Sequence, residues 1–142
     1  MRIRTAIPRD YAICASIYES AWNLALPGAQ RSIGVRELEN ETADELTLVG
    51  VIDETVCGYI SIWEPDWFIH HLYVDPATQG SGVGKYLLEH AESLAIPHSL
   101  SLKCQLTNDR AIGFYLSCGF TKTGEHGADE HGKWIGMVKV LD

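Results

Sequence analysis

The sequence predicts a mixed α/β fold in which a largely antiparallel central sheet is flanked by helices. Three observations support this prediction. Runs of residues with high β propensity and alternating polarity occur along most of the chain. Two long stretches show helical periodicity. The predicted helices and strands alternate in an order that requires at least one parallel crossover. The 142 residues are 46% hydrophobic, so we expect residues 1–142 to form a single domain with a substantial core.

The first elements lie within residues 2–45. Residues 2–7 alternate and predict a strand that Pro8 ends. Asp10 is a suitable N-cap for a helix that Pro27-Gly28 terminates. The apolar face expected for this helix consists of Ile13, Ile17, Ala21 and Leu24. The polar segment that follows carries a short helix around residues 35–40.

Three β-rich runs occupy the middle of the chain, at residues 46–52, 55–63 and 67–74. Asp53-Glu54 separates the first two and predicts a tight hairpin. Asp75-Pro76 ends the third run.

The last third of the chain returns to helical spacing before two further strands. One helix is expected from Val83 to Ala95, followed by a strand at residues 100–106. Asn108 is placed to cap a short helix that Gly119 closes. The final strands are expected at residues 120–126 and 133–140, joined by a loop that holds Gly127, Asp129 and Gly132.

The composition narrows the classes of function. A net charge of −8, from 11 basic and 19 acidic residues, argues against nucleic acid as a partner. No apolar run approaches the roughly 20 residues that span a bilayer, and Met-Arg-Ile-Arg-Thr lacks the apolar stretch of a signal peptide. We therefore expect a cytoplasmic protein with no membrane partner. The four cysteines form no Cys-x-x-Cys pair and are expected to be reduced.

The segment Gln79-Gly80-Ser81-Gly82-Val83-Gly84 lies between a predicted strand and a predicted helix. Its glycines let backbone N–H groups approach a ligand, and the helix start adds unpaired donors, so we expect a phosphate site. A P-loop would require Ser or Thr after Lys85, where Tyr86 stands, and a dinucleotide fingerprint would require glycine at position 85.

A second motif lies at residues 108–120 and reads Asn-x-x-Ala-x-x-Phe-Tyr-x-x-x-Gly-Phe. Together with Gln-x-x-Gly-x-Gly at 79–84 and Leu-Tyr-Val-Asp-Pro at 72–76, it resembles the GNAT N-acetyltransferases. The resemblance covers about residues 45–126 and implies the fold of that family. It also implies transfer of an acetyl group from acetyl-CoA to a primary amine of a small molecule or peptide.

The resemblance implies a set of positions for the co-substrate. The loop N–H groups would hold the pyrophosphate, the free backbone groups of Leu72 and Val74 would pair with the pantetheine amides, and the Leu72 N–H is a candidate oxyanion donor. Asn108 would contact the pantetheine arm, and Ala111 would leave room for it. The complete set of residues expected to bind acetyl-CoA is Leu72, Tyr73, Val74, Gln79, Gly80, Ser81, Gly82, Val83, Gly84, Lys85, Asn108, Ala111 and Tyr115.

Tyr115 is the general acid implied by the resemblance, because a phenol with a pKa of about 10 can protonate a thiolate whose thiol has a pKa of about 8.5. Many members of the family carry a basic glutamate eleven residues before Gln79, but here that position is Phe68. His70 lies two residues further on the same strand face, where some arylalkylamine acetyltransferases have a histidine. We expect His70, or a water molecule, to act as the base.

His71 is expected on the opposite strand face in a structural role, so the His70-His71 pair is not expected to chelate a metal ion and no metal site is predicted. Glu64 is a second candidate base. Tyr18, Trp22, Trp63 and Trp67 are candidate residues of the acceptor pocket.

Two other readings of the sequence remain open at this point. A non-catalytic acyl-CoA-binding regulatory domain would explain the missing strand glutamate but not Tyr115. An unrelated nucleotide-binding domain would leave the motif at residues 108–120 unexplained. The sequence does not identify the acceptor amine, and it leaves a homodimer open.

Overall fold

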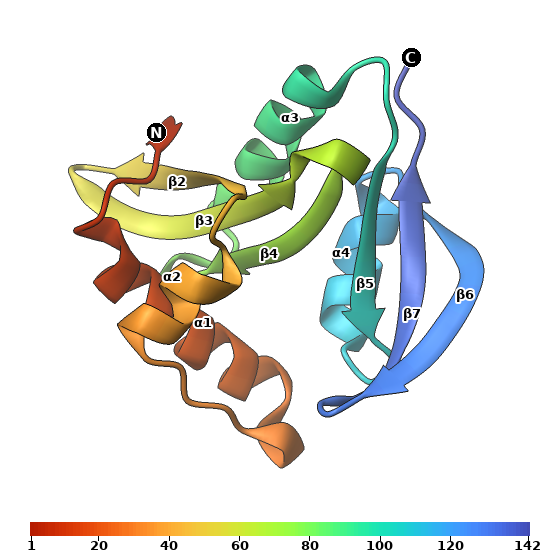
Figure 1. The fold of residues 1–142 in the computed structure, drawn as a ribbon, viewed down its shortest axis with the longest axis horizontal. Helices are drawn as coiled ribbons and strands as arrows, with labels where there is room; N and C mark the ends of the chain where they lie inside the picture. Colours follow the sequence, from red (N-terminus) through yellow and green to blue (C-terminus); the bar gives the residue numbers. More distant parts are fainter.

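A computed structural model describes all 142 residues and contains a seven-stranded sheet with the order β1-β2-β3-β4-β5-β7-β6 (Figure 1). Neighbouring strands are antiparallel except for the parallel pair β4–β5. The predicted mixed, mostly antiparallel sheet is therefore confirmed. The strands are β1 Arg2–Thr5, β2 Leu46–Ile52, β3 Thr55–Trp63, β4 Phe68–Val74, β5 Leu100–Gln105, β6 Thr121–Asp129 and β7 Gly132–Lys139.

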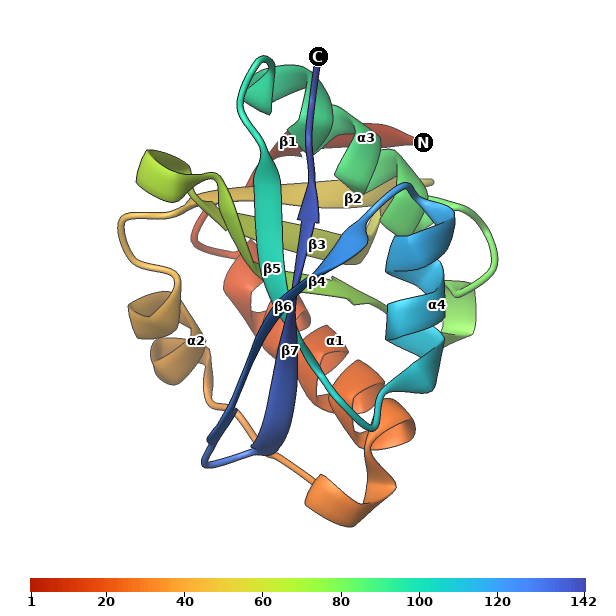
Figure 2. The ribbon, with the colours of Figure 1, turned by 90° about the vertical axis from the view of Figure 1, so that its right-hand side faces the viewer.

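Four α-helices cover the two faces of the sheet, with α1 and α2 on one face and α3 and α4 on the other (Figures 1 and 2). Each face has its own buried core, because the apolar residues of β2 and β3 alternate between the two sides. No helix is both long and apolar enough to cross a membrane. The helices are α1 Asp10–Ala25, α2 Val35–Glu41, α3 Val83–Ala95 and α4 Asp109–Ser117, with 3-10 turns η1 Pro27–Ala29, η2 Glu64–Asp66 and η3 Pro76–Thr78.

The start and the buried face of α1 differ from the prediction. Arg9 occupies the N-cap position, while the Asp10 carboxylate accepts a 2.8 Å hydrogen bond from the Ile7 N–H and pairs with Arg4. Asp10 thus anchors the helix to β1 rather than capping it. Ile17 and Ala21 are buried as predicted, but Ile13 and Leu24 are exposed. The rest of the buried face is formed by Cys14, Ala15, Tyr18 and Trp22.

Other element boundaries also differ from the prediction: β1 ends at Thr5 rather than at residue 7, and β5 ends at Gln105 rather than at residue 106. Trp67 adopts a left-handed conformation at the end of η2, so β4 begins one residue later than expected. Strand β6 continues through Gly127 to Asp129, and only Glu130 and His131 remain in the turn to β7. All four cysteines are free, as expected.

The start of α3 lies unusually close to the sheet. A Cβ on Gly58 would lie 3.0 Å from Val83 Cγ1 and 3.0 Å from the Tyr73 carbonyl oxygen, and one on Gly50 would lie 3.2 Å from Val83 Cγ1. These two glycines of β2 and β3 therefore let the first turn of α3 pack directly on the strand backbones.

Strands β4 and β5 pair at only two positions, Phe68 with Ser101 and Ile69 with Leu102. Beyond these pairs the two strands diverge (Figure 1). The remaining edge of β4 has no partner strand on this side, so its backbone groups are free to bind another extended segment.

Candidate active site

A cleft of about 840 Å³ opens where β4 and β5 diverge. Its lining combines the loop that precedes α3, the free edge of β4 and the first turns of α4 with residues of α1, α2 and the β6–β7 turn. Segments that are far apart in the sequence therefore meet around one cavity.

The glycine-rich loop forms one end of this cleft. Gly80 and Gly82 have φ angles of 89° and 90°, and Gly82 is the N-cap residue of α3. No heavy atom lies within 4 Å of a Cβ added at either position, so both glycines face open space. Gln79 Nε2 donates a 3.4 Å hydrogen bond to the Val74 carbonyl oxygen and ties the loop to β4. The loop thus presents backbone N–H groups and the positive end of a helix dipole to the cleft.

Strand β4 divides its side chains between the two faces of the sheet. Leu72 and Val74 pack against the core beneath α3, whereas Tyr73 contacts α1, with its ring centroid 4.6 Å from that of Tyr18. The predicted cofactor position Tyr73 therefore contributes its side chain to the opposite side of the cleft from the glycine-rich loop.

Helix α4 brings Asn108 and Tyr115 to the cleft. Asn108 Oδ1 accepts a 3.1 Å hydrogen bond from the Ala111 N–H, which confirms the predicted helix cap. Burial raises the pKa of Tyr115 well above its ordinary value, which keeps the phenol protonated. The Tyr115 hydroxyl has no hydrogen-bond partner within the protein. Every fully buried side-chain polar atom does have a partner, so the Tyr115 hydroxyl cannot be fully buried and must be exposed to the cleft.

A bulge in β4 overturns the expectation that His70 and His71 lie on opposite faces. Ser61 pairs with His71 while the next residue, Ile62, pairs with Ile69, so His70 is an extra residue without a partner on β3. Both imidazoles consequently lie on the side of α1 and α2, with ring centroids 4.4 Å apart. The argument that opposed faces prevent chelation is therefore wrong.

His70 is held by a carboxylate that the sequence reasoning missed. Its Nδ1 lies 2.9 Å from Glu45 Oε2, and the Glu45 side chain is only 9% exposed. Ser61 Oγ donates a 2.5 Å hydrogen bond to Glu45 Oε1, and Thr47 Oγ1 lies 3.1 Å from Ser61 Oγ. This buried network orients the imidazole so that Nδ1 faces the carboxylate and Nε2 remains available.

His71 lies deeper and has a different set of partners. Its Nδ1 is 2.9 Å from the Tyr59 hydroxyl, and its Nε2 is 3.3 Å from Glu41 Oε2. Burial lowers the pKa of His71, and the adjacent imidazole lowers the pKa of the Glu41 carboxyl. A neutral imidazole beside an ionised carboxylate is the resulting state at neutral pH.

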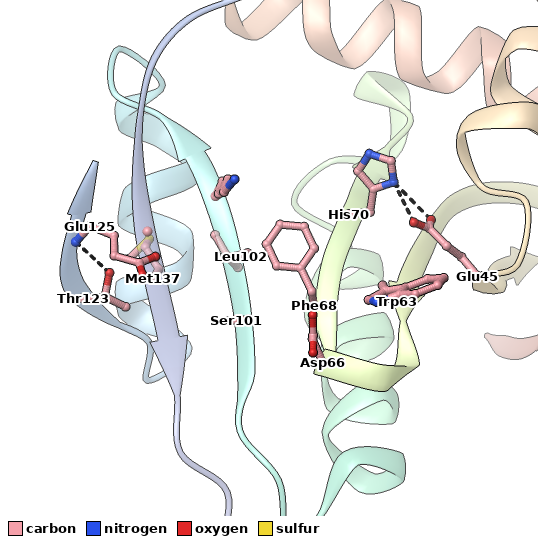
Figure 3. Close-up of a pocket in the computed structure, with 12 residues that line it drawn as sticks. Glu45, Trp63, Asp66, Phe68, His70, Ser101, Leu102, Thr123, Glu125 and Met137 are labelled. Carbon is pink, nitrogen blue, oxygen red and sulfur yellow. Dashed lines mark hydrogen bonds and ion pairs between the residues drawn. The ribbon is translucent and has the colours of Figure 1, made fainter. Parts of the chain in front are cut away.

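A second cavity of about 470 Å³ adjoins the cleft and shares Phe68, His70, Leu102 and Lys103 with it (Figure 3). Its other lining includes Asp66 and Glu125, which are exposed carboxylates, as well as the half-exposed ring of Trp63. Figure 3 shows the His70 ring facing Glu45 at one side of this cavity and Thr123 and Glu125 at the other. The cavity is acidic, which suits a cationic guest.

The four aromatic candidates for the acceptor pocket have different locations. Tyr18 and Trp22 line the cleft, with the Arg31 guanidinium 5.1 and 5.4 Å from their ring centroids. Trp63 lines the second cavity, but Trp67 stacks on His98 and lines neither. The alternative base Glu64 lies in η2 and also lines neither cavity.

The cleft also contains ionisable residues that no motif indicated, among them Arg31, Glu41, Glu130 and His131. The His131 ring lies 5.3 Å from that of Trp22, so the β6–β7 turn closes one end of the cleft against α1. The only sequence signal for these residues was the polar character of residues 29–45 and of the last turn.

Comparisons with known proteins agree with this arrangement. The family model described as "Acetyltransferase (GNAT) family" matches residues 13–120. Peptidyl-lysine N-acetyltransferase YjaB from Salmonella typhimurium is 42% identical over 70 residues, which are 49% of this chain and 47% of that protein. Its counterpart from Escherichia coli is 42% identical over 62 residues, or 44% of this chain and 41% of that protein. The matched stretch thus spans less than half of each curated relative.

Solved structures share the fold over the whole chain. The solution structure of apo YjaB from Escherichia coli has a TM-score of 0.80 at 23% identity and covers 99% of this chain and 98% of that one. The structure of yncA from Salmonella typhimurium with its cofactor acetyl-CoA has a TM-score of 0.74 at 25% identity. The match covers 100% of this chain and 94% of that one. With a family model matched over most of its length, the chain belongs to the GNAT family of acetyltransferases.

Proposed function

We propose that the protein transfers an acetyl group from acetyl-CoA to a primary amine of a small molecule or peptide. The observation that carries this proposal is that one cleft is lined by the glycine-rich loop, the free edge of β4, the Tyr115 side chain and His70. A domain that only bound acyl-CoA would need the first two features but neither a free phenol nor an oriented imidazole.

Acetyl-CoA would bind along the α3 and α4 side of the cleft. The N–H groups of Gly80 and of residues 82–84 hold the pyrophosphate, with Lys85 and the dipole of α3 adding positive potential. The Ser81 N–H is not available, because it donates a 3.1 Å hydrogen bond to the Thr78 carbonyl oxygen. The backbone groups of Leu72 and the N–H of Val74, which lie beyond the last pair with β5, bind the pantetheine amides as an added strand would. The N–H of Leu72 then donates to the thioester oxygen as negative charge develops on it.

The acceptor amine would approach from the side of His70. The Nε2 atom of His70 removes a proton from the ammonium group, directly or through a water molecule, while Glu45 holds Nδ1 and stabilises the imidazolium. The amine nitrogen bonds to the acetyl carbon, the C–S bond breaks, and Tyr115 protonates the departing thiolate. The nitrogen loses its second proton to solvent, and the Tyr115 phenolate regains a proton from solvent. The acidic second cavity attracts the positively charged amine to this position.

A lysine side chain is the first acceptor to test, because two relatives bear the name peptidyl-lysine N-acetyltransferase. The first experiment is calorimetric titration with acetyl-CoA and CoA, followed by a thiol-release assay with lysyl peptides and a panel of small amines. Micromolar binding together with release is expected. Binding without release from any amine would favour the acyl-CoA-binding alternative, and absence of binding would contradict both.

The role of His70 is tested by His70→Ala. Turnover is expected to fall by about 10²-fold, the lower end of what a general base contributes, while affinity for CoA stays near that of the unmodified enzyme. His90→Ala, which removes an exposed histidine of α3 outside the cleft, is the matched control. Full turnover in His70→Ala would assign proton removal to solvent alone.

A further inference from the structure

Three potential metal ligands meet at the α2 side of the cleft, and the proposed reaction uses only one of them. One ring nitrogen each of His70 and His71 and one carboxylate oxygen of Glu41 all lie within 4.8 Å of one another. The histidines come from the bulge in β4, and the glutamate is the last residue of α2. Two imidazoles and one carboxylate form a ligand set that zinc accepts, with a fourth position left open for water.

Each imidazole already has the kind of outer partner that metal-binding histidines use. Nδ1 of His70 faces the Glu45 carboxylate at 2.9 Å, and Nδ1 of His71 faces the Tyr59 hydroxyl at 2.9 Å. A partner on Nδ1 fixes the ring orientation and leaves Nε2 to coordinate the ion. The carboxylate–histidine arrangement on His70 is a recurring form of this support in zinc sites.

One distance between two of the ligand atoms is close to that expected around a tetrahedrally coordinated ion. Ligand atoms about 2.0–2.1 Å from zinc lie about 3.4 Å apart in a tetrahedral site. Nε2 of His71 and Oε2 of Glu41 are already 3.3 Å apart. The His71 side chain is 3% exposed and fixed, whereas the Glu41 side chain is 31% exposed and can turn to close the remaining gap.

The surroundings leave the site open to the cleft. All three residues line the cleft, which supplies the entry path and room for a water ligand. Arg31 Nη2 pairs with Glu41 Oε1 at 3.7 Å, whereas Oε2 is the oxygen that lies beside His71, so Oε2 can coordinate an ion while Oε1 keeps its ion pair.

We propose that Glu41, His70 and His71 bind a divalent transition-metal ion of the zinc type. Binding would require the tautomer of His71 in which Nδ1–H donates to Tyr59, and it would place the ion on Nε2 of His70. Metal binding does not depend on the proposed function. A consequence that does depend on it is that the bound ion occupies the lone pair that would accept the substrate proton, so zinc should inhibit acetyl transfer.

The test uses Co²⁺ as a spectroscopic probe on the metal-free, full-length protein without substrates. Titration is expected to give visible absorption bands that saturate at one ion per chain, and Zn²⁺ should abolish them by displacement. Glu41→Gln and His70→Ala are expected to weaken binding at least tenfold, in line with loss of one of three protein ligands. Circular dichroism verifies that each variant is folded, and His90→Ala serves as the matched control.

Absence of saturable Co²⁺ and Zn²⁺ binding in the micromolar range would overturn the proposal. Equal binding by the unmodified protein, Glu41→Gln and His70→Ala would also overturn it, because the ion would then lie elsewhere. The outcome is separate from that of the amine assay: a protein that binds the ion but releases no thiol would contradict the proposed function and leave the metal site intact.

Discussion

The two walls of the cleft are built in different ways. The wall beside α3 and α4 offers mainly backbone N–H groups and one phenol, supplied by two contiguous segments at residues 79–85 and 108–115. The wall beside α1 and α2 offers side chains, with Glu41 and Glu45 brought to His70 and His71 from more than 20 residues away. A backbone site can be encoded by a short motif, but a side-chain site depends on the register of the whole sheet.

In the wall beside α3 and α4, Tyr115→Phe is expected to have the largest effect on turnover. Removal of the hydroxyl should lower kcat by about 10²-fold or more, because the thiolate would leave without its acid, while the Kd for CoA changes little. Steady-state kinetics and calorimetry measure the two quantities. Tyr86→Phe, an exposed tyrosine of α3, is the control. If the Tyr115→Phe enzyme kept its full kcat, this wall would bind acetyl-CoA without taking part in the chemical step.

Gly82→Val tests the backbone character of the same wall. Valine at a φ of 90° is strained, and its side chain would project into the open space where phosphate is expected. The Kd for acetyl-CoA should rise about tenfold or more, which corresponds to about 1.4 kcal/mol. Gly28→Val in η1, where a Cβ also meets open space, should leave the Kd unchanged. Equal affinities for the two variants would place the pyrophosphate elsewhere.

Glu45→Gln addresses the side-chain wall through its buried carboxylate. Loss of the charge that orients His70 is expected to lower turnover by about tenfold, with the affinity for acetyl-CoA preserved. Steady-state kinetics with the best amine from the panel gives the value. Glu39→Gln, on the exposed side of α2, should behave as the unmodified enzyme. If both variants were equally active, the His70–Glu45 pair would have no part in the reaction.

Asp10→Asn is expected to have the smallest effect on turnover and to change stability instead. The Arg4 guanidinium, at 2.7 and 3.1 Å, holds the pKa of Asp10 below its ordinary value. The stabilisation is therefore complete above the pKa of the unfolded chain and is lost as the pH falls through the lower, folded value. Thermal unfolding should show a lower Tm for the variant at neutral pH and a shrinking difference in acid. A difference independent of pH would remove the electrostatic explanation.

The same contrast explains what the sequence could predict. The Asn108 cap, the hairpin at Asp53-Glu54 and the start of α3 at Val83 depend on neighbouring residues, and all three were predicted correctly. The family and its fold followed from two such local motifs and are confirmed. These features depend on interactions that a stretch of a few residues encodes.

The positions of His70 and His71 could not be predicted in this way. Strict alternation along a strand places them on opposite faces, but the pairing of β3 with β4 skips one residue and turns both rings to the same side. Glu45 reaches His70 from 25 residues away through a connection that has no periodic pattern. The proposed base and the proposed metal site therefore depend on long-range pairing rather than on any motif.

The close packing of Gly58 beneath α3 has a consequence for how the co-substrate site can vary. Val83, which a side chain at position 58 would press against, is the first residue of the helix whose N-terminus faces the expected pyrophosphate. A single methyl group on the middle of β3 would have to lift that helix end or shift the backbone of Tyr73. If acetyl-CoA binds as proposed, its affinity would thus be coupled to Gly58, which does not line the cleft, and mutational scans that consider only the cleft lining would overlook this position.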